Sequence, residues 1–535
     1  MYKALSIGIA AVAAVLLLLG SGPRTVEAAT TVLVFTTADS GPGSFRAAID
    51  QANNNSNVGH IRFLTNGPIT LNDPVEYEGS QPLTIAGLFN TVIQGQSTNP
   101  VGNTDLVCDV DDDEGLFEST GGADLTLISL TFQNNPCGNG VYVFLDDDED
   151  VSITLNRVMA RNNDEDGVRI EEDSYCSGGT DINLTVTTST FSGNGNDGLE
   201  INDEGDGDVT ASLRFSAFRD NGEDGFDIYE ECDGDVSLTT LSSSFNDNGW
   251  DSEEDGEGID VDERGSGYVE VTLNGLDASR NTDDGVDVDE MDGSEIDSLS
   301  LQGGEAGEAD PEDKQPAASD GPQTATCEGD NLTLTVNGGR ANDNDSDGFD
   351  IDEEDCGSLY MTVTGVMASG NADDGFQADE YGPGDLDFTA GSATSADRNG
   401  SGDVDEDGNG FQLYEESYGS LYVSLASVGA RYNGAFDESG DGIDLEEWDN
   451  GDLVLDMGVS AVLSNFDDGI DAEEYGCGTL DATLLSSTVS LNADDGIDAE
   501  QEYDCGDPDG ELTLIFTSVV ANLDEDLELD GVVLN

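Results

Sequence analysis

The hexapeptide Gly348-Phe-Asp-Ile-Asp-Glu353 decides the fold, because variants of it recur along most of the chain. Each variant runs glycine, apolar, polar, apolar, polar, and then usually an acidic residue. Eleven copies begin at glycines 167, 198, 225, 258, 285, 348, 375, 410, 442, 469 and 496. Five of the steps between successive copies are 27 residues long. A fixed period of about 20 to 50 residues is typical of solenoid proteins, so we expect one coil per copy.

The alternation within each hexapeptide is that of a β-strand, whose successive side chains point to opposite faces. Asp-Gly opens nine of the copies and suits a tight turn. A second alternating run follows in each coil, as in Ser358-Leu-Tyr-Met-Thr-Val363, and no segment of the repeats has a helical period. The sequence therefore predicts an all-β fold, a single-stranded parallel β-helix of about 27 residues per coil. Equivalent strands would lie about 4.8 Å apart.

An asparagine precedes most of the hexapeptide glycines by four residues. Asparagines at one position of successive coils can stack, because each amide both donates and accepts hydrogen bonds. Such a ladder is evidence for the fold and carries no catalytic meaning. The asparagines at this position are Asn163, Asn194, Asn221, Asn281, Asn344, Asn371, Asn465 and Asn492.

The ends of the chain differ from the repeats. Residues 1–28 have the features of a secretory signal peptide: Lys3, an apolar stretch over 4–19, and small residues before position 28. No later segment is apolar enough to span a membrane, so we expect a secreted or cell-surface protein. The segment 527–535 resembles a last hexapeptide strand with nothing to cover it. Three explanations stay open: an exposed end that allows end-to-end self-association, a truncated chain, or a loop folded over it.

We divide the chain accordingly. The parts are the signal peptide (1–28), an N-terminal cap with the first coils (29–100), coils (101–302), an acidic, proline-containing loop insertion (303–325) and further coils (326–535). The loop falls in the 63-residue step from Gly285 to Gly348, and we expect it to replace the hexapeptide strand of one coil.

Eight cysteines in an exported protein predict disulfides. Three pairs are 28 or 29 residues apart and would lie on neighbouring coils: Cys108 with Cys137, Cys327 with Cys356, and Cys477 with Cys505. Cys176 and Cys232 are 56 residues apart, or about two coils. That separation is too long for a bridge in an undistorted stack, so their pairing stays open.

The segment before the repeats predicts a short helix over 44–52, with Ser44 as its N-cap, covering the first layer of the core. The stretch from Asp39 to Asn53 resembles the N-terminal signature of secreted bacterial right-handed parallel β-helix proteins. The wording from Ser189-Thr-Phe191 through Gly198-Leu199 is similar to repeats of the pectate-lyase-like superfamily. The resemblance implies a right-handed β-helix, and it implies no single activity because this fold hosts many.

The charge of the chain is strongly negative and unevenly distributed. It has 117 acidic and 15 basic residues, for a net charge of −102, which argues against a nucleic-acid partner and favours cations. Acids recur two and four residues after the hexapeptide glycine, where the alternation points them outward. The outward positions of the second strand are mainly threonine, serine and asparagine. We therefore expect one acidic face and one nearly neutral face.

Stacked carboxylates need a counter-charge. Two of them about 5 Å apart repel by about 0.8 kcal/mol in water and by several-fold more near a protein surface. The arginines before the hexapeptides are too few to balance them. Ca²⁺ binds six to eight oxygens with tolerant geometry, so we expect multiple weak Ca²⁺ sites. One stretch, from Asp343 to Glu354, also matches the EF-hand loop pattern, although it lacks flanking helices. The candidate metal ligands are Asp227, Asp260, Asp262, Asp287, Asp289, Asp343, Asp345, Asp347, Asp350, Asp352, Glu354, Asp444, Glu446, Asp471, Glu473, Asp498 and Glu500.

These patterns favour a non-catalytic extracellular β-helical rod that binds divalent cations and serves in adhesion or matrix assembly, with glycans or other surface proteins as partners. The alternative is a carbohydrate-active enzyme, a glycoside hydrolase or lyase, using an acidic pair such as Asp260 and Asp262. A catalytic pair should be unique, whereas these acids are repeated. The second alternative is that the acidic face is only an adaptation to salt or for solubility. Uniform columns favour the rod; a groove of aromatic residues with one distinct acidic pair favours the enzyme.

Overall fold

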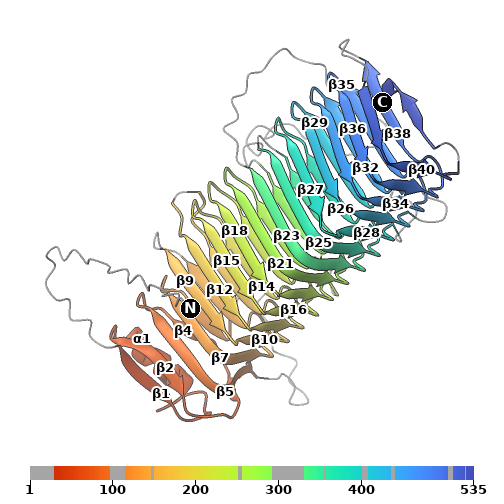
Figure 1. The fold of residues 1–535 in the computed structure, drawn as a ribbon. Coiled ribbons are helices and arrows are strands. Elements are labelled where there is room, and N and C mark those ends of the chain that lie inside the picture. The colour runs from red at the N-terminus through yellow and green to blue at the C-terminus, as the bar shows by residue number, and fades with distance from the viewer. Residues whose placement is uncertain are drawn as a thin grey trace, which may run out of the picture.

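The computed structural model is a parallel β-solenoid of about 14 turns, drawn out into a rod (Figure 1). The structure describes residues 29–96, 115–145, 150–176, 178–250, 256–291, 331–354, 357–400, 408–434, 440–503, 510–523 and 526–535. The predicted signal peptide, the 303–325 loop and Cys108, Cys327, Cys356 and Cys505 lie outside these residues. The all-β, parallel β-helical fold predicted from the hexapeptide is confirmed.

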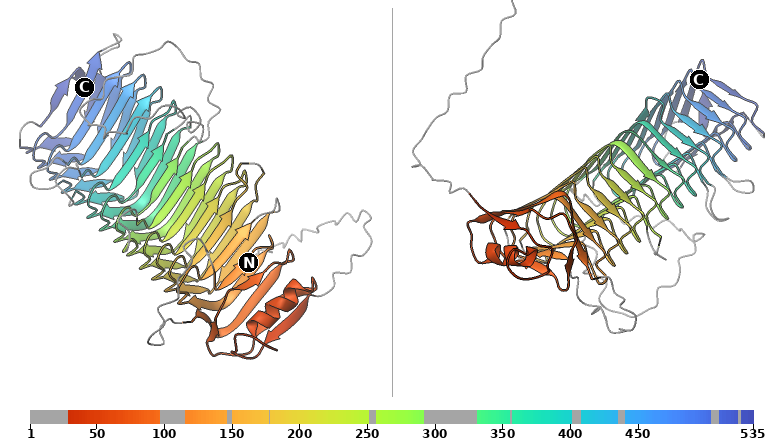
Figure 2. Two further views of the ribbon diagram at one scale, coloured as in Figure 1. Left: turned by 180° about the vertical axis from the view of Figure 1, so that it is seen from behind. Right: turned by 90° about the horizontal axis from the view of Figure 1, so that it is seen from below.

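Two sheets run the length of the rod, and the N-terminal helix lies at one end of it (Figures 1 and 2). Sheet B has 15 strands: β4 (Val75–Tyr77), β6 (Phe117–Ser119), β8 (Val141–Leu145), β11 (Val168–Glu172), β14 (Leu199–Asp203), β17 (Phe226–Glu230), β20 (Ile259–Glu263), β22 (Asp287–Glu290), β24 (Asp350–Glu353), β26 (Phe376–Glu380), β29 (Phe411–Ser417), β32 (Ile443–Asp449), β35 (Ile470–Gly476), β38 (Asp498–Tyr503) and β41 (Glu528–Asp530).

Sheet A has 27 strands. They are β1 (Thr30–Val34), β2 (Val58–Phe63), β3 (Ile69–Leu71), β5 (Leu83–Gly95), β7 (Leu125–Gln133), β9 (Val151–Asn156), β10 (Met159–Arg161), β12 (Ile182–Thr187), β13 (Thr190–Ser192), β15 (Val209–Arg214), β16 (Ala217–Arg219), β18 (Val236–Leu241), β19 (Ser244–Asn246), β21 (Val269–Ser279), β23 (Leu332–Asn342), β25 (Leu359–Ser369), β27 (Leu386–Gly391), β28 (Ser395–Asp397), β30 (Leu421–Ala426), β31 (Gly429–Arg431), β33 (Leu453–Gly458), β34 (Ala461–Leu463), β36 (Leu480–Leu485), β37 (Thr488–Ser490), β39 (Gly510–Ile515), β40 (Ser518–Val520) and β42 (Val532–Leu534).

The hexapeptides form sheet B, and their apolar residues fill the core. Phe376 and Ala378 of β26 are fully buried, while the residues between them face outward. Equivalent apolar side chains stack from coil to coil. The rings of Phe349, Phe376 and Phe411 are stacked with centroids 5.0 Å apart at each step. This vertical packing fixes which residues of neighbouring coils lie opposite each other.

Each coil typically also contributes a six-residue and a three-residue strand to sheet A, joined by a corner. The corner residue adopts a left-handed backbone conformation, as Thr188 (φ 52°) does between β12 and β13. A second left-handed residue, such as Asp220 (φ 55°), follows the short strand. These two residues turn the chain through the corners without a helix.

The predicted asparagine ladder follows the second corner and is confirmed. Asn344 Nδ2 donates to Asn371 Oδ1 at 3.2 Å, and Asn371 Nδ2 donates to Asn399 Oδ1 at 3.3 Å. The backbone N–H of each asparagine donates to the same oxygen of the next coil. The ladder also includes three asparagines that the four-residue spacing missed, because their turns are longer: Asn248, Asn399 and Asn433.

The N-terminal cap is helix α1 (Phe45–Asn53), as predicted within one residue at each end. Ser44 is its N-cap, and the Ser44 hydroxyl accepts a hydrogen bond from the Ala47 backbone N–H at 3.2 Å. Phe45 contacts the rings of Phe63 and Phe117, with centroids 5.4 and 6.0 Å apart. The helix therefore covers the first layer of the core.

The 63-residue step from Gly285 to Gly348 is a single coil. Strand β21 pairs directly with β23, and β22 pairs directly with β24. The expectation that the acidic loop replaces a hexapeptide strand is therefore wrong: the strands on either side of it are neighbours in both sheets. The additional residues are inserted between β22 and β23.

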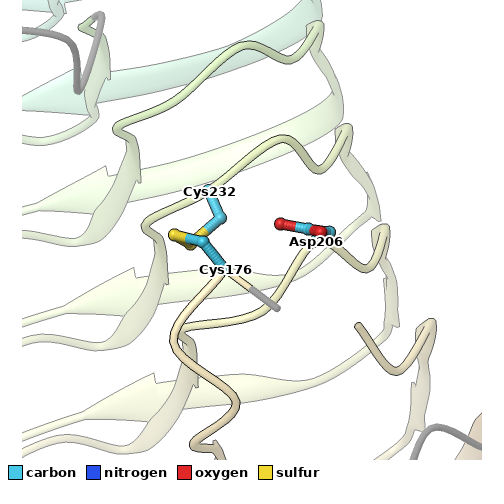
Figure 3. Close-up of side chains that lie close together, drawn as sticks. All are labelled: Cys176, Asp206 and Cys232. Atoms are coloured by element: carbon cyan, nitrogen blue, oxygen red, sulfur yellow. A yellow bond between two sulfur atoms is a disulfide. The ribbon is translucent and has the colours of Figure 1, made fainter. Parts of the chain in front are cut away.

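Cys176 and Cys232 form a disulfide although they are 56 residues apart, with their Cα atoms 5.4 Å from each other (Figure 3). Spacing alone had argued against this bridge. The coil that begins at Gly167 is 31 residues long, four more than the common step. Its turn reaches the next coil, where Cys176 N–H donates to Glu204 O at 2.9 Å. Cys232 Sγ approaches the same carbonyl from the coil beyond, at 3.3 Å.

Cys137 and Cys477 are also disulfide-bonded. Their predicted partners, Cys108 and Cys505, lie outside the described residues, so those two pairings stay predictions.

Candidate cation-binding face

Two columns of acidic side chains run along the outer face of sheet B. The +2 column holds the second residue after each hexapeptide glycine, and the +4 column holds the fourth. Asp227 pairs with Asp260, Asp287 with Asp350, and Asp444 with Asp471 in the +2 column. In the +4 column the paired residues are Asp262 with Asp289, Asp289 with Asp352, Glu446 with Glu473, and Glu473 with Glu500. Asp498 follows Asp471 in the +2 column, since the preceding residues Ile470 and Ile497 pair.

The remaining predicted ligands do not form one loop. Asp343, Asp345 and Asp347 lie in the turn before β24, and Glu354 follows its last residue. An extended strand therefore separates Glu354 from the three aspartates, so the EF-hand pattern is not an EF-hand loop. Asp343 and Asp345 are exposed, whereas Asp347 is buried.

A third column, one residue before each hexapeptide glycine, is buried beside the +2 column. We call it the −1 column. Each of its carboxylates accepts a hydrogen bond from the backbone N–H of its counterpart one coil on. Asp197 N–H donates to Asp166 Oδ1 at 2.9 Å, and Asp224 N–H donates to Asp197 Oδ1 at 2.7 Å. Asn409 takes one place in this column and accepts in the same way from Asp441 N–H, at 2.7 Å.

The −1 and +2 columns together create carboxylate trios that span two coils. In each trio one oxygen from every member lies within 4.8 Å of the others. The trios include Asp166 with Asp197 and Glu200, Asp224 with Glu257 and Asp260, and Glu257 with Asp284 and Asp287. Two ligands of one Ca²⁺ ion, each about 2.3 to 2.6 Å from it, lie at most about 5 Å apart. The spacing of the trios fits such an ion.

The first trio already has a cation from the protein itself. The guanidinium of Arg169 lies 2.9 Å from Glu200 and 3.9 Å from Asp166, on the +2 column. From Glu200 onward the +2 column is acidic or amide-bearing at each paired position of the described strands. The protein therefore shows where a positive charge belongs and then stops supplying it.

The arginines that recur before the hexapeptides do not neutralise sheet B. Arg280 binds Asp247 through two hydrogen bonds of 2.7 Å, and Arg340 binds Asp277 through two of 2.8 Å. These pairs belong to the sheet A side and its corner. On the outer face of sheet B, Arg264 binds Asp262 at 2.7 Å.

A fourth acidic column, the +5 column, points into the core, as the strand alternation requires. Its members include Glu353, Glu380, Glu415 and Glu447, all fully buried. Each accepts a hydrogen bond from the backbone N–H of a glycine four residues on, for example Gly419 N–H to Glu415 Oε1 at 2.8 Å. Gln501 occupies the same column with an amide. These residues shape the turn after the strand.

Burial makes the charged form of these acids costly, because water no longer solvates it. Desolvation, followed by repulsion from Glu473, raises the pKa of Asp471 to about 9. Desolvation and the neighbouring Asp379 raise the pKa of Asp352 to about 8. Desolvation also raises the pKa of Asp227 and Asp444 well above the usual range. Neutralisation by protons or by cations is thus required at neutral pH.

A row of aromatic side chains lies beside the acids in the second half of sheet B. It consists of Tyr381, Tyr414, Trp448 and Tyr475, with neighbouring ring centroids 5.6, 6.5 and 4.7 Å apart. Each polar group of the row bonds an acid on its own strand. Trp448 Nε1–H donates to Glu446 at 2.9 Å, and the Tyr475 hydroxyl donates to Glu473 at 2.5 Å. The row was missed in the sequence because its members stand four or six residues after their glycines.

A separate groove of about 490 Å³ lies over sheet A near the N-terminal end. Its lining includes Arg62, Arg157, Ser129, Thr131 and Thr188. The lining contains no aspartate or glutamate among the described residues, so this groove does not offer the carboxyl pair that glycoside hydrolysis needs.

Near the disulfide, Asp206 faces Cys176 and Cys232 (Figure 3). The two sulfurs are bonded to each other and are not thiolates, so the three residues do not form a metal site.

Comparison of the fold with solved structures finds β-helix proteins at low similarity. A tailspike protein 2 domain of bacteriophage CBA120 matches with 9% identity and a TM-score of 0.37, covering 71% of this chain and 48% of that one. This chain thus spans about half the length of the tailspike domain. Pectate lyase Pel9A matches with 13% identity and a TM-score of 0.31, covering 76% and 81%. A GH87 α-1,3-glucanase catalytic domain matches with 10% identity and a TM-score of 0.32, covering 91% and 68%.

No protein-family profile and no curated protein matches the sequence. Among the described residues, no helix has the length and apolar character that crossing a bilayer demands.

Proposed function

We propose that the chain is a non-catalytic extracellular rod whose sheet B face binds divalent cations, Ca²⁺ above all, and uses the loaded face in adhesion or matrix assembly. The single observation that carries this proposal is the vertical register of carboxylates in the +2 and +4 columns. Repetition makes a cation array out of groups that would be unremarkable alone. The same repetition argues against catalysis, which needs one distinct pair.

Three features support cations rather than solvation alone. The +2 acids are half-buried, while acids that only attract water belong on exposed positions. The outward residues of sheet A strands such as β12 are polar and uncharged, so the acids gather on one face. Arg169 supplies a positive charge at the trio of Asp166 and Glu200. An adaptation to salt would place acids on all faces.

The test is thermal unfolding of chelator-treated protein in CaCl₂ and in NaCl at matched ionic strength. A weak extracellular site has a dissociation constant of about 1 mM, so 10 mM Ca²⁺ would stabilise the fold by about 1.4 kcal/mol per site. We expect a clear rise of the melting temperature with Ca²⁺ only. Equal responses to the two salts would reject specific sites and leave solvation as the explanation.

A matched pair of variants locates the effect. Asp471 has Asp444 as its neighbour in the +2 column, whereas Asp456 of sheet A lies between Ser424 and Thr483. Asp471→Asn should reduce the Ca²⁺-dependent rise, and Asp456→Asn should leave it unchanged. Equal effects of the two substitutions would mean that the response comes from overall charge.

A carbohydrate-active enzyme is the second candidate, and the aromatic row favours it. Ring faces provide apolar contact for the C–H faces of sugars, and flanking carboxylates can bind hydroxyl groups. Glu446 and Glu473 lie on neighbouring coils beside Trp448 and Tyr475. Their spacing, however, is that of every pair in the column.

Incubation with neutral polysaccharides separates the two candidates. Release of reducing ends that disappears in Glu473→Gln would establish the enzyme. Binding that depends on Trp448 without any release would fit the rod, with glycans as its partner.

A further inference from the structure

Glu257 stands where the −1 column changes its residue type. The neighbouring coils have Asp224 and Asp284 at this place, and glutamate is one methylene longer. Glu257 is 5% exposed, and its backbone N–H keeps the ladder bond to Asp224 Oδ1 at 2.7 Å. Its own carboxylate breaks the pattern: Glu257 Oε2 is buried and has no hydrogen-bond partner.

The unpartnered oxygen points into a group of acids from three successive coils. Glu257 belongs to two of the carboxylate trios at once, one with Asp224 and Asp260 and the other with Asp284 and Asp287. Within each trio one oxygen per residue lies within 4.8 Å of the others. Asp287 Oδ1 is likewise buried without a hydrogen-bond partner. Five carboxylates thus converge where the other described trios join three.

The protein offers this group no positive charge of its own. Arg169, which serves the first trio, is bound to Glu171 and Glu200. The nearby Arg264 binds Asp262 at 2.7 Å and lies over the Tyr229 ring, on the outer face. A buried anion without a hydrogen bond or counter-charge costs several kcal/mol, so something must fill this place.

We propose that Glu257 is the shared ligand of a buried Ca²⁺ centre formed with Asp224, Asp260, Asp284 and Asp287. An all-oxygen set of carboxylates suits a hard cation, and irregular geometry favours Ca²⁺ over Mg²⁺, which demands a near-ideal octahedron. Because the ligands are buried and held by the stack, this centre binds Ca²⁺ more tightly than the half-exposed columns. The inference deepens the proposed cation-binding function and rests on it.

The centre is tested by calorimetric Ca²⁺ titration of the chelator-treated full chain at pH 7.5 in 0.15 M NaCl. We expect two classes of sites, with the tight class binding at least tenfold more strongly than the rest. Glu257→Gln keeps the side-chain shape but removes the charge, and it should abolish the tight class while the weak class remains. Glu354→Gln removes an exposed acid beyond β24 and is the matched control.

Glu257→Asp guards against a variant that fails to fold, since aspartate is the residue of the neighbouring coils. The shorter side chain cannot join both trios, so we expect the tight class to weaken at least tenfold. Titration in buffers of different ionisation enthalpy adds a second readout, because Ca²⁺ must displace any proton held by the acids. Wild-type protons released on binding the tight class should be lost in Glu257→Gln.

The outcomes separate the centre from the wider proposal. A tight class that survives in both Glu257 variants, or a wild-type protein with weak sites only, overturns the Glu257 centre and leaves the cation-binding face intact. If Ca²⁺ acts no differently from NaCl, both ideas fail.

Discussion

Raising the pH should destabilise the metal-free protein, in contrast to proteins whose acids are paired with bases. Asp284 is 6% exposed. Desolvation, with repulsion from Asp283, raises its pKa from 3.8 to about 7. Between these values the folded chain holds a proton that the unfolded chain releases. The stabilising contribution is complete below pH 3.8 and is lost as the pH rises through 7.

The size of the effect follows from the shift. Three pKa units correspond to about 4 kcal/mol for one well-buried carboxyl group. Desolvation also raises the pKa of Asp471 to about 9 and of Glu415 to about 7, which extends the loss toward pH 9. The groups interact, so their effects will not add simply. We expect the free energy of unfolding to fall by at least about 4 kcal/mol from pH 5 to pH 8.5 in chelator.

Urea denaturation followed by circular dichroism, at pH values from 5 to 8.5, measures this. The window avoids acids with a lowered pKa, such as Asp277, whose hydrogen bonds from Arg340 favour the charged form and weaken only at lower pH. With saturating Ca²⁺ the profile should become flat, because cations replace the lost protons. A metal-free protein that is most stable near pH 8 would refute the reasoning.

The remaining predictions concern the fold. Asn371→Ala should lower the free energy of unfolding by about 1 to 3 kcal/mol, since it leaves the Asn344 amide and the Asn371 N–H side of the ladder without its stacked partner, measured by urea denaturation against Asn337→Ala on the exposed edge. Phe376→Ala should cost about 3 to 5 kcal/mol, because it empties the middle of a three-ring stack, and a loss below 1 kcal/mol would contradict this packing. Cys176→Ser should cost about 4 kcal/mol, as expected for a closed loop of 56 residues, and reduction of the wild type should add nothing to the variant's loss at this bridge.

The fold could be predicted because its signals are repeated. A single strand of alternating residues is ambiguous, but eleven copies at a steady spacing specify both the strand and its neighbours. The outward direction of Asp471 and Glu473 followed from the inward direction of Ile470 and Ala472, and the strand pairing agrees.

What escaped prediction depends on turns of unequal length. Four additional residues in one coil carry Cys176 past its neighbour to Cys232, and spacing alone could not show their path. The left-handed corners are formed by residues as different as Thr188, Phe215 and Val459, so no residue type marks them. The convergence at Glu257 was hidden because the −1 position lies in a turn, where strand alternation gives no direction.

The junction between β22 and β23 has a practical consequence for engineering. Chain length can grow there while both flanking strand pairs stay intact, because the ends of the excursion are fixed by the ladder itself. The entropic cost of a longer closed loop increases only by about 0.6 kcal/mol per doubling of its length. The same junction should therefore carry a foreign folded module, which would turn the rod into a display scaffold with a cargo at one defined height.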